Sequence, residues 1–283
     1  MPPRITVIIS TYNWSTVLPY SIGSVLSQSF TDFEVLVIGD GCTDDSEQVV
    51  TATDDPRVRW INLPKRTGHQ SGPNNEGLRQ ARGEVVAYLG HDDLWLPHHL
   101  AALDNGADWS GSILSAVRPD GGLDPLVPRP GGRSWMAPSA IVHRRAATET
   151  VGGWRDYREL SVGPEHDLWR RVAAARFRFT FVRRLTGLKF PASVRRDIYR
   201  ERPCHEQAEW LRRIRTEPDL EAIELSNMVA TLNGRFLSRL SGRLGRFIRR
   251  PSQWLPVIWR RNGARIKAVQ RFKGVDHVRS SNR

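Results

Sequence analysis

Residues 83–100, which read GEVVAYLGHDDLWLPHHL, decide the fold expected of this chain. The apolar run at 85–89 has the length of a buried strand. It ends at Gly90, and Asp92 and Asp93 follow side by side. Because adjacent carboxylates at a buried strand end repel each other, we expect a positive group to share the site, and a divalent cation is the simplest candidate. Such a cation could hold a diphosphate.

The composition is that of a chain with a substantial core, since 39% of its 283 residues are hydrophobic. One large domain, or a domain with an appendage, is expected at this length. The two cysteines, Cys42 and Cys204, are far apart, which favours a reduced, cytoplasmic compartment over a disulfide framework. The start of the chain predicts no signal peptide, and no stretch approaches the ~20 apolar residues of a membrane span.

The net charge of +12 is unevenly distributed. Residues 230–283 contain 14 Lys/Arg and one acidic residue, Asp276, which leaves 28 Lys/Arg and 29 Asp/Glu for residues 1–229. We therefore expect a neutral domain with a basic tail. Within the domain, we distinguish two halves, residues 1–105 and residues 106–229.

Strands and helices are expected to alternate over the first hundred residues. This order predicts an α/β fold, in which a doubly wound, mostly parallel sheet has flanking helices. Ligands of such sheets bind outside the carboxyl ends of the strands, where Thr11, Asp40, Asp92 and Asp93 are expected. The predicted strands are 5–9, 33–38, 58–63 and 85–89, and the predicted helices are 15–27, one that starts at 44–46, and 74–82.

The second half is harder to interpret. Residues 106–132 are rich in Gly, Pro and Asp and indicate loops around short strands. We expect a strand that ends near residue 143 and another at 177–182. The predicted helices are 165–175, 201–215 and 219–233.

The basic tail is expected to form a helix, because arginines recur at helical spacing with apolar residues between them. This pattern, with tryptophans nearby, fits an anionic membrane surface contacted through residues 234–272. An arginine-rich helix could also bind nucleic acid, but a duplex would not explain the apolar face. A third interpretation is that the helix packs on the domain with its arginines in solvent.

Three segments, VIISTYN, VLVIGDGCTDDS and NNEGLRQARGEVVAYLGHDDLW, occur in an order that resembles the inverting nucleotide-sugar glycosyltransferases of family 2, which have the GT-A fold. The resemblance covers residues 4–105 and continues to about residue 185 through APSAIVHRR and GPEHDLWRR. It implies a metal-dependent, inverting transfer of a sugar from a nucleotide-diphosphate donor, with UDP preferred. The acceptor would be a hydroxyl group of a glycan, a lipid-linked glycan or a small molecule. The tail would bring the enzyme to the inner face of the membrane.

The resemblance implies that residues 1–105 form a nucleotide-sugar-binding half and residues 106–229 an acceptor-binding and catalytic half. It also implies roles for individual residues on the donor side. Thr11 and Tyr12 match the loop that holds the nucleobase, and Asp40 matches the aspartate that accepts a hydrogen bond from the base. Asp93 would contact Mn²⁺ or Mg²⁺ directly, and Asp92 would help with the ribose or the metal. A further expectation is that His69 contacts a phosphate. The structural alternatives are a turn acid for Asp40 and a helix cap for Asp92.

On the acceptor side, the resemblance puts Glu165 in the position of the catalytic base, with Asp167 as the alternate. Such a base takes the proton of the acceptor hydroxyl as its oxygen attacks the anomeric carbon. Weaker candidates for acceptor contacts are Trp135 and His143, for which a core role is the alternative. Adjacent histidines near residue 98 could suggest zinc, but zinc prefers separated ligands around a tetrahedron.

The sequence departs from the family pattern at three positions where acids are usual, because Gly39, Gly90 and Pro164 stand there. A non-catalytic, nucleotide-sugar-binding relative is therefore an alternative function. A nucleotidyltransferase is a further class with paired acids. It usually needs a glycine-rich loop after the first strand, and Ser10–Trp14 contains no glycine.

Overall fold

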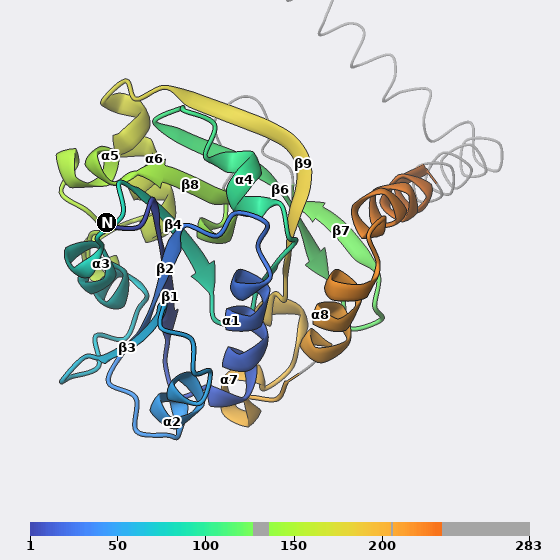
Figure 1. Cartoon of the computed structure of the whole chain (residues 1–283), viewed down its shortest axis with the longest axis horizontal. Coiled ribbons are helices and arrows are strands. Elements are labelled where there is room, and N and C mark those ends of the chain that lie inside the picture. The colour runs from blue at the N-terminus through green and yellow to red at the C-terminus, as the bar shows by residue number, and fades with distance from the viewer. Residues whose placement is uncertain (127–135, 205, 234–283) are drawn as a thin grey trace, which may run out of the picture. The chain divides into compact units, whose positions relative to one another are not determined.

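The computed structural model describes residues 1–126, 136–204 and 206–233. Its first half contains four parallel strands in the order β3-β2-β1-β4 (Figure 1). The strands are β1 (Ile5–Thr11), β2 (Phe33–Gly39), β3 (Val58–Asn62) and β4 (Val85–Gly90). The helices between them are α1 (Leu18–Leu26), which a short 3-10 turn η1 (Ser15–Val17) precedes, α2 (Ser46–Thr51) and α3 (Ser71–Gln80). The predicted alternation of strands and helices is confirmed here.

The second half continues the same sheet in the order β4-β8-β6-β9-β5. Strand β8 is antiparallel to both β4 and β6, β6 is parallel to β9, and β9 is antiparallel to β5. A ninth strand, β7, pairs with β6 at the side. The strands are β5 (Leu94–Trp95), β6 (Trp109–Val117), β7 (Leu123–Leu126), β8 (Ile141–Arg144) and β9 (Phe179–Lys189). In the described residues the sheet is therefore mixed, with parallel pairing from β3 to β4 and between β6 and β9 and antiparallel pairing elsewhere.

The remaining helices flank this sheet. They are α4 (His99–Leu103), α5 (Arg145–Thr150), α6 (Pro164–Ala174), α7 (Ile198–Glu201) and α8 (Gln207–Thr216), with short 3-10 turns η2 (Pro138–Ala140), η3 (Tyr157–Glu159) and η4 (Ala192–Val194). Helix α8 lies beside α1 in Figure 1 and packs against it and against β5. Residues 1–228 form one compact unit.

Both faces of the sheet are covered, which explains why the strands are continuous apolar runs. On one face, Ile5, Val7 and Ile9 of β1 pack with Leu18 and Ile22 of α1. The opposite face has a second cluster, in which β1, β2 and β4 pack against α3 and α6. Its members include Ile8, Leu36, Leu78, Val86, Tyr88, Trp154, Leu168 and Trp169.

Two predictions about the second half are corrected in their bounds. Residues 109–117, within the segment expected to form loops around short strands, form the nine-residue strand β6, in which Ser110, Ser112 and Ser115 are buried. The strand expected at 177–182 runs on to Lys189, past two exposed arginines. No helix in the described parts of the chain combines the length and hydropathy that a membrane span requires. The expected tail helix and its membrane contact at 234–272 lie outside the described residues.

Candidate functional site

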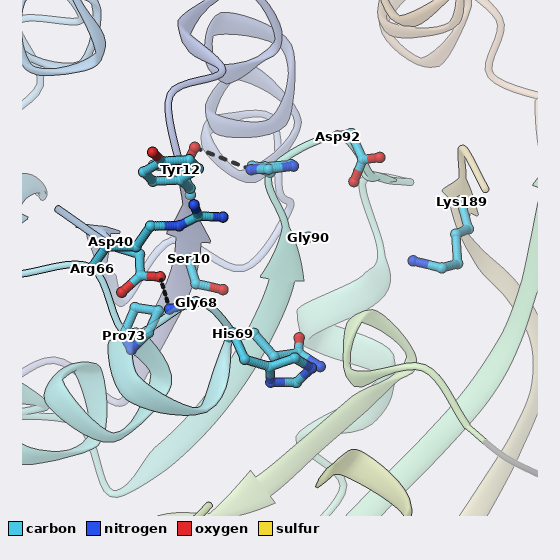
Figure 2. Close-up of a pocket in the computed structure, with 13 residues that line it drawn as sticks. Ser10, Tyr12, Asp40, Arg66, Gly68, His69, Pro73, Gly90, Asp92 and Lys189 are labelled. Carbon is cyan, nitrogen blue, oxygen red and sulfur yellow. Dashed lines mark hydrogen bonds between the residues drawn. The ribbon is translucent and has the colours of Figure 1, made fainter. Parts of the chain in front are cut away.

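A pocket of about 410 Å³ opens at the carboxyl ends of β1, β2 and β4 (Figure 2). This is the edge at which doubly wound sheets bind their ligands. Thr11, Tyr12, Asp40, His69 and Asp92, all predicted from the sequence to bind nucleotide, line it together. The other lining residues are Ser10, Arg66, Gly68, Gln70, Pro73, Gly90, His91 and Lys189.

Asp40, which follows β2, fixes one wall of the pocket. Its Oδ1 accepts hydrogen bonds from the Thr67 amide and hydroxyl, both at 2.7 Å, and its Oδ2 accepts one from the Gly68 amide at 2.9 Å. A carboxylate has about four acceptor sites, so one acceptor position remains for a ligand donor such as a uracil N–H. Asp40 is 4% exposed and lines the pocket, so it can anchor the loop and still accept a hydrogen bond from a nucleobase.

Tyr12 and Thr11 line the pocket at the end of β1. The guanidinium of Arg66 lies 3.9 Å from the centroid of the Tyr12 ring, and that of Arg202 lies 5.6 Å from it. Thr11 Oγ1 lies 3.1 Å from Nδ1 of His91, whose pKa burial lowers. The aromatic ring and the planar cation together form a surface on which a nucleobase can stack.

Asp92 and Asp93 differ sharply in their surroundings. Asp92 lines the pocket, and burial, together with the neighbouring charge of Asp93, raises its pKa. Asp93 is 0% exposed and does not line the pocket. Its Oδ2 accepts hydrogen bonds from Ser139 Oγ at 2.6 Å and Lys189 Nζ at 3.1 Å. Asp92 is therefore the carboxylate that a ligand in this pocket meets.

The two glycines that replace family acids after strands are closely surrounded. A Cβ on Gly90 would lie 2.8 Å from Asp93 Oδ2, and one on Gly39 would lie 2.6 Å from Asn62 Oδ1. Asn62 is itself bonded to both the amide and the carbonyl of Cys42. Neighbouring side chains thus occupy the space that a longer residue would need at either position.

Lys189, the last residue of β9, enters the same pocket from the second half of the sheet. Figure 2 shows its side chain on the side of Asp92, across the pocket from Tyr12, Asp40 and Arg66. Sequence reasoning missed Lys189 because it ended the strand at 182. The rule that polar residues after a strand face the ligand edge would have found it, had the strand been extended to its true end.

Glu165 borders the pocket from the first turn of α6. Gln70, which lines the pocket, lies close enough for its Nε2 to donate to Glu165 Oε2 at 3.4 Å. Asp167 is instead 7% exposed and accepts a 2.7 Å hydrogen bond from Arg171 Nε one turn later. It also lies 3.7 Å from Arg155. This pairing argues against Asp167 as a base and for Glu165.

His69 lines both this pocket and a smaller one of about 200 Å³, whose wall includes Tyr157 and Asp156. The rings of His69 and Tyr157 have centroids 5.1 Å apart. Burial lowers the pKa of His69. A neutral imidazole can donate a hydrogen bond to a phosphate but adds no positive charge. His69 would therefore contact a phosphate only through a neutral hydrogen bond.

His143, predicted as an acceptor contact, lies in the core at 1% exposure. Its Nδ1 donates to the carbonyl of Arg144 at 2.8 Å, and its ring packs between Tyr88 and Trp169. This burial argues against a contact with the acceptor and favours the core alternative. Trp135, the other acceptor-side prediction, lies outside the described residues.

The metal prediction can be tested on the donor atoms present. Among the described residues no group of three or more His, Cys, Asp or Glu side chains is placed to hold a metal ion. The pocket offers the carboxylate of Asp92, while the oxygens of Asp93 are already bonded. Mg²⁺ and similar hard cations commonly take one or two carboxylates and complete their shell with substrate phosphates and water. The residues fit such a cation through Asp92.

The family model described as glycosyl transferase family 2 matches residues 6–154, just over half of the chain. The chain therefore belongs to glycosyltransferase family 2, as its resemblance implied. The GalNAc(5)-diNAcBac-PP-undecaprenol beta-1,3-glucosyltransferase of Campylobacter jejuni is 36% identical over 106 residues, which cover 36% of this chain and 33% of that protein. The chain spans about a third of the length of the curated relatives it matches.

Solved structures agree on the fold. S. aureus TarS 1-349 in complex with UDP-GlcNAc has a TM-score of 0.55 at 20% identity, with 82% of this chain and 72% of that chain covered. The mannosyltransferase PcManGT from Pyrobaculum calidifontis in complex with GDP-Man and Mn²⁺ has a TM-score of 0.55 at 17% identity, with 88% and 81% covered. The expected GT-A-like α/β fold is confirmed.

Proposed function

We propose that this chain is a metal-dependent inverting glycosyltransferase that moves a sugar from a nucleotide-diphosphate donor, with UDP preferred, to a hydroxyl acceptor. The observation that carries the proposal is the arrangement of one pocket. Asp40 and Tyr12 stand at one end, Asp92 at the other, and Glu165 borders it through Gln70. In the proposed reaction these are a base-reading group and a diphosphate-side carboxylate within one cavity, with a general base at its border.

In the proposed reaction the acceptor hydroxyl oxygen attacks the anomeric carbon of the donor sugar from the side opposite the diphosphate. The bond between that carbon and the diphosphate oxygen breaks, and the diphosphate leaves with the electron pair. Glu165 accepts the hydroxyl proton as the new bond forms. Gln70, bonded to Oε2 of Glu165, orients the carboxylate.

Asp92 would hold the Mg²⁺ or Mn²⁺ ion of the proposed reaction. A cation bound there supplies positive charge that stabilises the departing diphosphate. Asp40, whose oxygens accept hydrogen bonds from Thr67 and Gly68, would bind the base. The nucleotide would then be bound at both its base and its diphosphate. The complexes of TarS with UDP-GlcNAc and of PcManGT with GDP-Man and Mn²⁺ are consistent with a nucleotide-sugar donor and a metal.

The acceptor is proposed to be a sugar on a polyprenyl diphosphate. The name of the Campylobacter jejuni relative includes an undecaprenol-linked glycan, which supports this choice. The proposal sets the reaction on the cytoplasmic face of the membrane, where the basic tail would contact anionic lipid. A soluble glycan and a small molecule remain the acceptors against which the lipid-linked one is compared.

The experiment begins with thermal stability of the whole chain in the presence of UDP, GDP, dTDP or CDP, each with and without Mn²⁺. Ligands that bind only the folded state raise the melting temperature. We expect the largest rise with UDP and a further rise when Mn²⁺ is added. If no nucleotide raises it, the proposed donor pocket is wrong.

Turnover separates the enzyme from the non-catalytic relative that Gly39, Gly90 and Pro164 suggest. The purified protein is incubated with UDP-sugars and a polyprenyl diphosphate-linked sugar, and UDP release is measured. An enzyme releases UDP and extends the acceptor. Tight UDP binding without release from any UDP-sugar would identify a binding protein instead.

A further inference from the structure

Lys189 and Asp93 form a buried ion pair at the diphosphate end of the pocket. Lys189 Nζ lies 3.1 Å from Asp93 Oδ2, and the two side chains are 24% and 1% exposed. Asp93 comes directly after Asp92, whereas Lys189 is 96 residues further along. The pair therefore fixes the end of β9 against the loop that follows β4.

Asp93 is held by three donors that leave it facing the interior. Ser139 Oγ and Lys189 Nζ donate to Oδ2, and the amide of Phe190 donates to Oδ1 at 3.3 Å. Ser139 Oγ also accepts from the amide of Gly90 at 3.0 Å. For Asp93 to turn toward the pocket it would have to give up all three donors. A cation therefore costs less to bind at Asp92 than at Asp93.

Lys189 has the position and the chemistry to meet a diphosphate. It lines the pocket beside Asp92, and both Asp92 and His91 experience its charge. An ammonium has three N–H donors, and one of those of Lys189 is bonded to Asp93 Oδ2. Phosphate oxygens form charge-assisted hydrogen bonds with lysine, and these are stronger than neutral ones.

The positions of Arg66 and Lys189 in the pocket also favour a contact between Lys189 and a diphosphate. The guanidinium of Arg66 stacks on Tyr12 at the nucleoside side, away from Lys189 in Figure 2. A diphosphate extends from the nucleoside toward Asp92, where one carboxylate would repel it unless positive charge were present. Lys189 supplies that charge from the protein itself.

Resting on the proposed function, we infer that Lys189 contacts the donor diphosphate and that Asp93 is its positioning residue rather than a metal ligand. Gly90 is part of this arrangement, because any side chain there would displace Asp93. The site thus has Gly90 at the position of the further family acid and has Lys189 of β9 in the same pocket. This corresponds to a diphosphate subsite in which the protein shares the neutralising charge with the metal.

The first test measures dissociation constants of UDP and of uridine by calorimetry in EDTA, so that no divalent cation contributes. Lys189→Met is expected to weaken UDP binding by tenfold to a hundredfold, on the order of one charged hydrogen bond, and to leave uridine within about twofold. Lys189→Arg should retain most of the UDP affinity. Arg183→Met, which removes one exposed charge from the same strand, is the matched control and should change neither constant.

A double variant separates contact from support. Lys189→Met leaves the buried carboxylate of Asp93 without its cation. Combining Lys189→Met with Asp93→Asn removes both charges, so no uncompensated carboxylate remains. If Lys189 contacts the diphosphate, UDP binding stays weak in the double variant. Restored UDP binding would show that Lys189 only supports Asp93, and it would overturn the inference, as would unchanged UDP binding in Lys189→Met alone.

The second test compares UDP affinity with and without Mn²⁺ in Asp92→Asn and Asp93→Asn. We expect Mn²⁺ to strengthen UDP binding in the wild type and in Asp93→Asn, but not in Asp92→Asn. Loss of the Mn²⁺ effect in Asp93→Asn, with uridine binding intact, would make Asp93 a metal ligand. If the wild type binds no UDP at all, the proposed function fails rather than this inference.

Discussion

The parallel part of the sheet, β3-β2-β1-β4, and the mixed part, β8-β6-β9-β5, contribute differently to the same pocket. Thr11, Tyr12 and Asp40 each end or follow a parallel strand within the first 40 residues. Lys189 ends β9, a strand of the mixed part. Under the proposed function, the parallel part binds the nucleoside and supplies Asp92 beside the diphosphate, whereas β9 supplies Lys189 and helix α6 supplies the base Glu165.

The largest effect is expected from Glu165→Gln, which removes the proposed base but keeps the shape of the side chain. General base catalysis contributes about 10²- to 10⁴-fold, so sugar transfer should fall by that order. UDP affinity should not change, because the nucleoside end is untouched. Transfer is measured as UDP release and affinity by calorimetry.

Glu159→Gln is the matched control for this substitution, since Glu159 is an exposed carboxylate in the 3-10 turn that precedes α6. It should transfer sugar at the wild-type rate. If Glu165→Gln keeps full activity, α6 does not supply the base, and the division proposed above fails at its catalytic end.

The next largest effect is expected from Asp40→Asn in the parallel part. An amide in place of the carboxylate sets an NH₂ group against either the Gly68 amide or the donors of Thr67, so the loop at 67–70 loses an anchor. Hydrogen bonds to charged groups contribute about 1.5–3 kcal/mol each, so affinity should fall by about tenfold or more. Uridine and UDP should weaken by the same factor.

This equal loss is what distinguishes the two parts, since a diphosphate-side change is expected to weaken UDP alone. Asp45→Asn serves as control. Asp45 lies in the segment between β2 and α2, as Asp40 does, but it is exposed and its side chain makes no capping hydrogen bond. If Asp40→Asn weakened UDP but not uridine, the assignment of Asp40 to the base would be wrong.

The same two parts differ in how far the sequence could predict them. In the parallel part, one helix separates each strand from the next strand along the chain, so apolar runs and the residues after them were enough to place Thr11, Tyr12, Asp40 and Asp92 at one edge. The residues that these side chains contact, such as Thr67, could not be foreseen, because loop geometry decides them.

In the mixed part the pairing is between distant segments. Strand β6 pairs with β9 some 70 residues later, with a register shift near Ser112, and no local pattern specifies such a partner. The bounds of β6 could not be predicted because its buried positions include serines, which are more typical of loops. Asp92 lines the pocket, whereas Asp93 is held in the interior by Ser139 and Lys189. Because these partners are distant in the sequence, the sequence could not show which carboxylate faces the pocket.

A smaller effect is expected from acid, and it tests the interior of the mixed part. Burial lowers the pKa of His143 in β8 to about 4, below its usual 6.5. The unfolded chain therefore binds a proton first as pH falls from about 6.5 to 4, and the folded state loses stability over that range. For this one group the loss between pH 7 and pH 5 is about 2 kcal/mol.

Denaturant unfolding of the wild type and of His143→Gln at pH 7 and pH 5 measures this difference. Glutamine can still donate to the carbonyl of Arg144 but does not titrate, so the variant should lose about 2 kcal/mol less than the wild type over the interval. Equal losses in both proteins would mean that His143 is accessible to protons, which would reopen an acceptor-side role for it.

The smallest effect is expected from Arg66→Met at the nucleoside end. The Arg66 guanidinium lies over the Tyr12 ring at 3.9 Å, and such a contact contributes about 0.5–1 kcal/mol at an exposed site. Nucleotide affinity should therefore fall only about two- to fivefold, and equally for uridine and UDP, because the cation orients the ring rather than meeting the phosphates. A loss confined to UDP would show that Arg66 reaches the diphosphate. The parallel part would then share the phosphate-binding role assigned to Lys189.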